Sequence, residues 1–171
     1  MNEKLYCSNG LDETRIRRAF RWVVTFRDFP AGSYQTVDGD SMMKHSVTFF
    51  TKGRAEFYLD GVRRGDRVPG ILSTEHDIVG EGGEFTIKYI ENTSRVCIPI
   101  DINRWQLPKV KKHSLIKGDL IEVEVGFKGL VCLGSVSIDE KIIAEEKTFS
   151  IKDNTKQCLA LEDVLILQFL D

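Results

Sequence analysis

Alternation of apolar and polar residues, broken at short intervals by glycine turns, is the feature of this chain that most restricts its fold. Residues 55–59, 85–89 and 121–127 all follow this period of two. Successive side chains of a β-strand point to opposite faces, so the pattern predicts short strands that each bury one face. We therefore expect a mainly β protein.

Glycine turns predict how some of these strands are connected. Asp60-Gly61 is typical of a two-residue hairpin turn, because both central positions of such a turn take positive φ. After the Lys52-Gly53 turn, we expect residues 55–59 to fold back on residues 45–52 as a hairpin. Residues 164–167 are an unbroken apolar run, which predicts a buried strand near the end of the chain.

One short N-terminal helix is predicted at about residues 12–22. Asp12 is placed to cap this helix, and apolar side chains follow it at helical spacing. The run from Trp22 to Phe26 is equally typical of a β-strand, so the end of the helix stays open. The apolar positions of the predicted helix are Ile16, Ala19, Phe20 and Val23.

Length and composition describe an ordinary globular chain. With 171 residues, 42% of them hydrophobic and 29% charged, the chain is long enough to bury a core. Its net charge of -2 gives no general attraction for nucleic acid. We find neither a signal-peptide pattern nor a bilayer-spanning apolar segment, so we expect a cytoplasmic protein without a membrane partner. Widely spaced cysteines are interpreted as reduced thiols packed in strands: Cys7, Cys97, Cys132 and Cys158.

Two similar halves are suggested by short echoes in the sequence. Residues 50–53 resemble residues 126–129, and residues 91–101 resemble residues 162–171. A repeat of two small lobes and a chance likeness between strand-turn units both stay open. The predicted organisation is a helix with a lead-in strand (1–29), a β lobe (30–104), a connector (105–117), and a second lobe or barrel extension (118–171).

The stretch from Lys52 to Gly61, followed by residues 64–70 and then His76, resembles the centre of a cupin barrel. In that family a strand ends in a glycine turn, a Gly-Asp turn begins the next strand, and Pro-Gly precedes a histidine. The resemblance covers about residues 30–101. It implies a cupin-like (RmlC-like) double-stranded β-helix, or jelly roll.

Metal-binding cupins use two histidines one residue apart, then a glutamate and a final histidine. At the corresponding positions this chain has Asp38, Asp40, His45 and His76, so the motif is degenerate. The resemblance implies that this mixed set of nitrogen and oxygen donors holds a divalent ion such as Fe, Mn or Zn. The other interpretation is a polar Asp-Gly-Asp turn with two ordinary histidines.

Arginines suggest a site for an anion. Arg63, Arg64 and Arg67 are expected beside the barrel mouth, where Arg95 and Tyr58 would complete a site for an anionic small molecule. Cyclic-nucleotide-binding domains share the cupin barrel, and residues 80–84 with Arg95 have the residue types of their phosphate cassette but lack its short helix. A nucleic acid is expected only through a second cluster, which local ion pairs with nearby acids also explain: Arg15, Arg17, Arg18 and Arg21.

The leading functional hypothesis is a non-catalytic cupin-like module that binds a protein partner or assembles with its own copies, as a structural or accessory component of an assembly such as a virion. No catalytic triad, P-loop or dinucleotide fingerprint supports hydrolase or kinase chemistry. One alternative is a metal-dependent cupin enzyme (isomerase, epimerase or dioxygenase), in which Arg67 or Tyr58 faces the substrate. A second is a sensor for an anionic small molecule or nucleotide.

Overall fold

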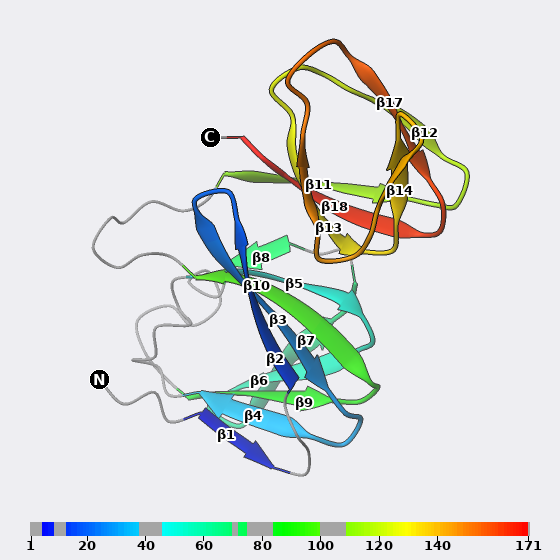
Figure 1. Ribbon diagram of the computed structural model, residues 1–171. Helices are drawn as coiled ribbons and strands as arrows, with labels where there is room; N and C mark the ends of the chain where they lie inside the picture. Colours follow the sequence, from blue (N-terminus) through cyan, green and yellow to red (C-terminus); the bar gives the residue numbers. More distant parts are fainter. Residues whose placement is uncertain are drawn as a thin grey trace. The chain divides into compact units, whose positions relative to one another are not determined.

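A computed structural model describes residues 5–8, 13–37, 46–69, 72–74, 84–99 and 109–170. Within these ranges, every regular element is a β-strand (Figure 1). The same residues include no helix with the length and apolar character needed to span a membrane.

The described strands number eighteen. The first ten are β1 (Leu5–Ser8), β2 (Glu13–Ala19), β3 (Trp22–Phe29), β4 (Tyr34–Val37), β5 (Ser46–Lys52), β6 (Ala55–Leu59), β7 (Val62–Arg67), β8 (Leu72–Thr74), β9 (Phe85–Tyr89) and β10 (Thr93–Pro99). The other eight are β11 (Val110–Leu115), β12 (Leu120–Val123), β13 (Lys128–Leu133), β14 (Val136–Ile138), β15 (Lys141–Ile143), β16 (Thr148–Ser150), β17 (Lys156–Ala160) and β18 (Val164–Phe169).

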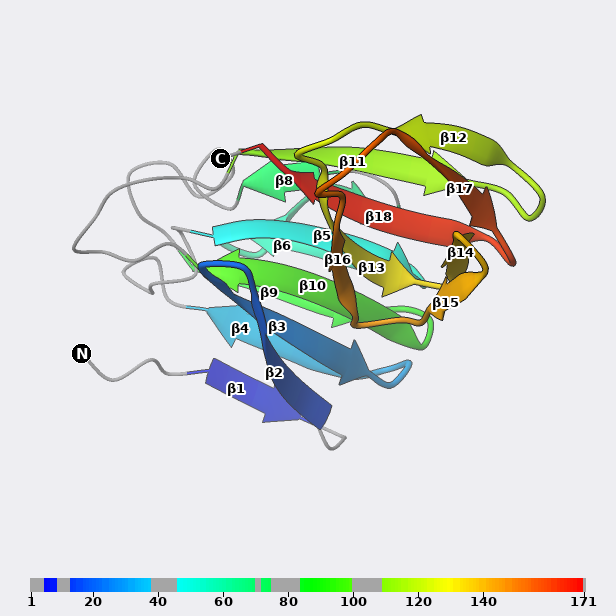
Figure 2. The same ribbon diagram turned by 45° about the horizontal axis from the view of Figure 1, so that its top comes forward.

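The chain divides into two compact units. Unit 1 comprises Met1–Arg17 with Trp22–Leu107, and unit 2 comprises Pro108–Asp171 with Arg18–Arg21, which are the end of β2 and the turn that follows it. Unit 1 has two antiparallel sheets, with strand orders β1-β4-β9-β6-β7 and β2-β3-β10-β5-β8. Unit 2 has two four-stranded sheets, with orders β11-β18-β13-β16 and β12-β17-β14-β15 (Figure 2).

The two units repeat one topology. If β3–β10 and β11–β18 are each numbered from one to eight, both units have sheet orders 1-8-3-6 and 2-7-4-5. This is the strand order of an eight-stranded jelly roll. Unit 1 carries β1 and β2 as additional strands at its sheet edges. The predicted mainly β jelly-roll fold is therefore confirmed, and the shared strand order favours a repeat over a chance likeness.

Glycines at equivalent turns support this correspondence. Gly53 and Gly134 follow β5 and β13, with φ of 82° and 77°. A Cβ on Gly53 would lie 2.5 Å from the carbonyl oxygen of Asn92, and one on Gly134 would collide with the carbonyl oxygen of Asp163. Within the described residues 91–99 and 162–170, the predicted echo is thus in register. The echo between residues 50–53 and 126–129 is wrong, because the structural counterpart of Gly53 is Gly134.

The predicted N-terminal helix is wrong: residues 13–19 form β2, and β3 begins at Trp22. Two of the four apolar positions that suggested a helix are exposed, Ile16 at 63% and Val23 at 43%, whereas Ala19 is buried. Trp22, Val24 and Phe26 are buried instead, with the period of a strand. Burial of one strand face therefore outweighs the helical spacing of a few apolar residues.

Of two predicted hairpin connections, one is confirmed and one is wrong. Asp60-Gly61 does form the β6–β7 hairpin, with φ of 50° and 76°. The predicted hairpin between residues 45–52 and 55–59 is wrong, because β5 pairs with β10 and β8 whereas β6 pairs with β9 and β7. The chain passes from one sheet of unit 1 to the other at Gly53.

The predicted boundaries need correction as well. Residues 110–115 of the predicted connector form β11, which pairs with β18 as part of unit 2. The predicted lead-in strand is present as β3, but it lies between β2 and β10 and is therefore part of a sheet of unit 1.

Candidate functional site

Aromatic side chains from both sheets fill the interior of unit 1. Phe29 on β3 and Tyr89 on β9 stack with ring centroids 4.1 Å apart and an interplanar angle of 4°. This stacked pair belongs to a buried cluster from four strands, β3, β5, β6 and β9. The members of the cluster are Phe29, Phe50, Ala55, Phe57, Phe85, Ile87 and Tyr89.

Arg95 enters this aromatic interior from β10. It lies directly opposite Phe50 on β5 and Arg27 on β3, and residues opposite each other in antiparallel strands share a sheet face. Its side chain is only 1% exposed, and its Cζ lies 5.6 Å from the ring centroid of Phe29. The Cζ of Arg27 lies 5.8 Å from the same centroid. Two guanidinium groups therefore meet one aromatic ring.

Gln35 on β4 adds a buried amide to the same interior. Its Oε1 accepts a hydrogen bond of 2.6 Å from the hydroxyl of Tyr89, and the residue is 0% exposed. Its Nε2 is buried too, and among the described residues it has no hydrogen-bond partner. A buried donor without a partner costs about 1–3 kcal/mol. Folding alone therefore leaves the amide donor of Gln35 without a hydrogen bond to the described residues.

Unit 2 has apolar residues where unit 1 has this polar set. Ile166 on β18 is the counterpart of Arg95, because it lies opposite Val131 and His113 as Arg95 lies opposite Phe50 and Arg27. The sheet positions of Gln35 and Tyr89 hold Ile121 and Ala160 in unit 2. The buried core of unit 2 is lined by apolar side chains and Cys158. The jelly roll therefore does not require polar residues at these positions.

Two of the predicted anion residues on β6 and β7, Tyr58 and Arg63, lie on the sheet face away from the interior that holds Arg95. Arg63 is opposite Tyr58, on the face away from the buried Phe57. Its Nη2 lies 2.5 Å from Asp66 Oδ1, and its Nε lies 3.8 Å from Glu56 Oε1. Acidic partners therefore already neutralise part of this surface.

Tyr58 belongs to the same ion-pair group. Its hydroxyl donates a 2.7 Å hydrogen bond to Glu56, and this bond raises the pKa of Tyr58. Arg64 is exposed, whereas the guanidinium of Arg67 lies 5.1 Å from the ring centroid of Phe57. The structure thus brings Arg63 and Tyr58 together and places Arg95 separately, in the interior.

The predicted metal ligands Asp38, Asp40, His45 and His76 lie outside the described residues, as do residues 80–83 of the predicted phosphate cassette. Within the described ranges, no three or more His, Cys, Asp or Glu side chains are grouped to hold a metal. The described histidine, His113, makes a 2.8 Å hydrogen bond between its Nε2 and Gln168 Oε1. The metal site stays a prediction from the sequence.

The N-terminal arginines lie on a strand and a turn, so the predicted helical spacing of Arg17 and Arg21 is wrong. Arg15 Nη1 forms an ion pair of 2.6 Å with Asp28 Oδ2. Burial raises the pKa of Asp28, but hydrogen bonds from Ser94 and Arg15 outweigh it and leave this pKa below its usual value. The alternative of local ion pairs holds for Arg15. Nucleic-acid binding through Arg17, Arg18 and Arg21 stays a prediction.

Sequence reasoning identified Arg95 but missed Gln35 and Tyr89. Tyr89 followed Phe85 and Ile87 on an apolar strand face, so the alternation classed it as core. Residues 33–37 show no apolar alternation, so no signal placed Gln35 in the interior. A polar residue on a buried face becomes visible only when the sheet partners are known.

No family model and no curated protein matches this chain. Its fold resembles that of YhhW from Escherichia coli, a bacterial pirin, with a TM-score of 0.52 and 13% identity over 91% of this chain and 82% of YhhW. AerE from Microcystis aeruginosa gives a TM-score of 0.53 and 9% identity over 99% and 97% of the two chains. YhaK from Escherichia coli gives a TM-score of 0.53 and 11% identity over 96% of this chain and 93% of YhaK. All three are cupin-fold proteins, and this chain therefore has a cupin-like double-stranded β-helix fold.

Proposed function

We propose that this chain is a ligand-binding module whose first unit holds a small anion, a carboxylate or a phosphate, in its interior. The observation that carries the proposal is the buried Nε2 of Gln35, which has no hydrogen-bond partner among the described residues. An oxyanion would accept a hydrogen bond from this amide.

Arg95 supports an anion in particular. A guanidinium group in an apolar interior favours an oxyanion, because charge-assisted hydrogen bonds are about twice as strong as neutral ones. Arg95 and Gln35 both contact the stacked pair of Phe29 and Tyr89. Unit 2 has Ile166 and Ile121 at the equivalent positions, so the polar set fits a functional role better than a structural one.

A test compares thermal unfolding in sodium oxalate, sodium phosphate and sodium chloride at matched ionic strength. A ligand that binds only the folded state raises its stability by about 2.7 kcal/mol at one hundred times its Kd. Oxalate or phosphate should therefore raise the Tm of the unmodified protein above its value in chloride. The anion with the larger effect identifies the ligand class.

Two substitutions introduce the residues of unit 2: Arg95→Ile and Gln35→Ile. Both should abolish the anion-dependent rise in Tm, and Gln35→Ile answers the question if Arg95→Ile does not fold. Arg63→Gln is the matched control, because it removes an exposed guanidinium outside the interior. The proposal fails if neither anion stabilises the unmodified protein, or if the rise in Tm persists in folded Gln35→Ile.

Self-association or a protein partner, a cytoplasmic location and the absence of catalysis stay predictions from the sequence. Sedimentation velocity tests the first of these. The metal-enzyme alternative depends on Asp38, Asp40, His45 and His76. It predicts stoichiometric Fe, Mn or Zn in the purified protein that is lost in the double variant His45→Ala with His76→Ala.

A further inference from the structure

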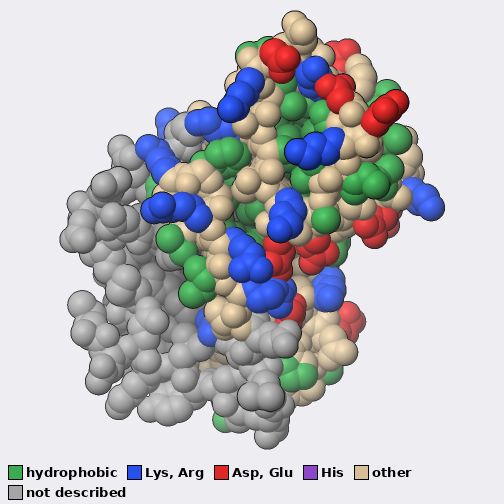
Figure 3. Space-filling view, in the orientation of Figure 1, with side chains coloured by type: hydrophobic (Ala, Val, Ile, Leu, Met, Phe, Trp, Pro, Cys, Tyr) green, Lys and Arg blue, Asp and Glu red, His purple; other side chains and the backbone are tan. Residues whose placement is uncertain are grey.

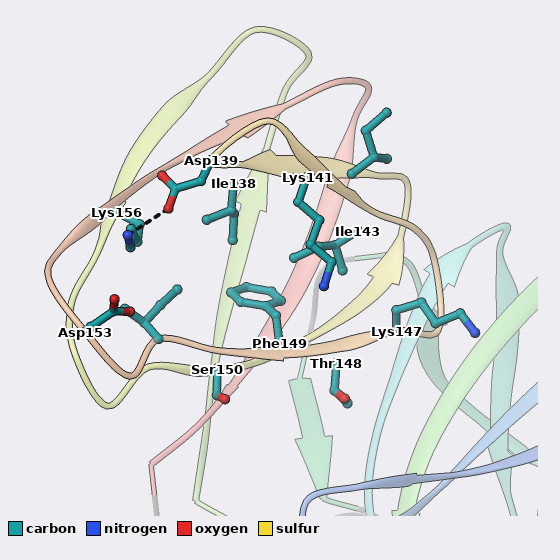
Figure 4. Close-up of a pocket in the computed structure, with 12 residues that line it drawn as sticks. Ile138, Asp139, Lys141, Ile143, Lys147, Thr148, Phe149, Ser150, Asp153 and Lys156 are labelled. Atoms are coloured by element: carbon teal, nitrogen blue, oxygen red, sulfur yellow. Dashed lines mark ion pairs between the residues drawn. The ribbon is translucent and has the colours of Figure 1, made fainter.

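Unit 2 has an opening between the edge strands of its two sheets. β15 ends one sheet and β16 ends the other, and a cavity of about 640 Å³ lies between them (Figure 4). This volume falls in the range of about 300–1,000 Å³ that is usual for small-molecule sites. Hydrophobic side chains show among charged ones on the visible face of this unit (Figure 3).

Apolar side chains form the floor of the opening. Ile138 and Ile143 are buried, and in Figure 4 they point toward the ring of Phe149. That ring stacks on Phe127 with centroids 5.6 Å apart. A Cβ on Gly129 would lie 2.5 Å from Phe149 Cζ, so this glycine gives the ring its place against the strand. The floor is therefore a packed aromatic and aliphatic surface.

Charges on the rim are unevenly neutralised. Lys156 Nζ forms an ion pair of 2.7 Å with Asp139 Oδ2, and this hydrogen bond raises the pKa of Lys156. Lys141 forms no ion pair with any described residue. It shares a face of β15 with the buried Ile143, because residues two apart in a strand point the same way. In Figure 4 its side chain extends into the opening, whereas that of Lys147 points away.

We propose that this opening binds a small organic anion with an aromatic or branched apolar group. The carboxylate pairs with Lys141, and the apolar group lies against Phe149 and Ile138. Charge complementarity at Lys141 and the apolar floor together select this class of ligand. The proposal concerns other residues in the other unit, so it stands independently of the anion site at Arg95.

Three probes separate charge from apolar contact in a titration followed by two-dimensional NMR of backbone amides. Benzoate carries both a ring and a charge, benzyl alcohol only the ring, and acetate only the charge. Benzoate should shift the amide signals of β15 and β16 and bind more tightly than either other probe. Equal affinity for benzoate and one of the other two would overturn the proposal, as would benzoate shifts confined to other strands.

Lys141→Met removes the charge and keeps an apolar stem, and Lys147→Met is the matched control. Lys141→Met should weaken benzoate binding about fivefold or more, whereas Lys147→Met should change it less than twofold. Equal effects of the two substitutions would refute a role for Lys141. Arg95→Ile should leave the benzoate shifts on β15 and β16 unchanged, which distinguishes this site from the one in unit 1.

Discussion

Arg95 and Ile166 occupy the same position in the two repeated jelly rolls of this chain. Arg95 lies on β10 between β3 and β5, Ile166 lies on β18 between β11 and β13, and each faces the interior of its unit. One strand arrangement therefore tolerates either a guanidinium or an isoleucine at this site. The fold therefore does not require the charge of Arg95 at this position, whereas an anionic ligand would.

Gly134→Ala should destabilise the protein strongly. A non-glycine residue in the left-handed region costs about 1–2 kcal/mol, and the clash with the Asp163 carbonyl adds about 2 kcal/mol. Gly118→Ala is the control, since it has φ of 91° but nothing within 4 Å of the added Cβ. Urea unfolding should give a loss of about 3 kcal/mol for Gly134→Ala and about 1 kcal/mol for Gly118→Ala. Equal losses would show that close approach is not what requires glycine here.

Asn92→Ala and Asp163→Ala should have similar effects, because their side chains hold equivalent turns in the two units. Asn92 Oδ1 accepts a 2.9 Å hydrogen bond from Ala31 N, and Asp163 Oδ1 accepts one of 3.0 Å from Lys117 N. Each loss should cost about 1 kcal/mol, the usual net value of such a bond. Urea unfolding checks this, with the exposed neighbour Glu91→Ala as control. A large cost in only one unit would argue against equivalent turns.

The strands could be predicted from the sequence more readily than their partners. A strand with one buried face has an apolar residue at every second position, as in Phe85, Ile87 and Tyr89, whichever strand it pairs with. Pairing depends on contacts distant in the chain, and β5 and β6 adjoin in sequence yet belong to different sheets. The helix prediction failed for a related reason, since spacing alone cannot show that Ile16 and Val23 are exposed.

The candidate site was predictable only in part. Arg95 was selected for its charge, and the structure places it in the interior. Arg63 was selected on the same basis, but it lies on the other face of its sheet, beside Glu56 and Asp66. Gln35 could not be found from sequence, because its burial results from pairing of β4 with β9.

Asp28 should contribute stability that is lost in acid. Its pKa is lowered in the folded state, because hydrogen bonds from Ser94 and Arg15 outweigh burial. A lowered folded pKa stabilises the protein above the ordinary value of about 4, and this contribution disappears as the pH falls through the folded pKa. The stability difference between the unmodified protein and Asp28→Asn should therefore shrink below about pH 4. The stability difference between the unmodified protein and Ser94→Ala should also shrink in acid, but by less than that of Asp28→Asn. A difference for Asp28→Asn that stays constant across this range would contradict the assignment.

Buried thiols should be protected from alkylation in the folded protein. Burial raises the pKa of Cys158 to about 11 and raises that of Cys132 further. Because the thiolate is the reactive form, neither residue should react with iodoacetamide near pH 8, about the ordinary thiol pKa, unless urea is added. Labelling mapped by mass spectrometry checks this, and rapid modification of Cys158 without urea would contradict its burial.

The thiol of Cys158 should make the stability of the protein depend on pH in the alkaline range. A folded pKa raised above the ordinary value of about 8.5 stabilises the protein fully below that pH, and the contribution is lost as the pH rises toward the folded value. Tyrosines and lysines also titrate in this range, so the informative quantity is the stability difference between the unmodified protein and Cys158→Ala. That difference should be constant up to about pH 8 and should decrease between about 8.5 and the folded pKa of Cys158, about 11. A difference that stays constant throughout would mean that the thiolate forms as readily in the folded chain as in the unfolded one.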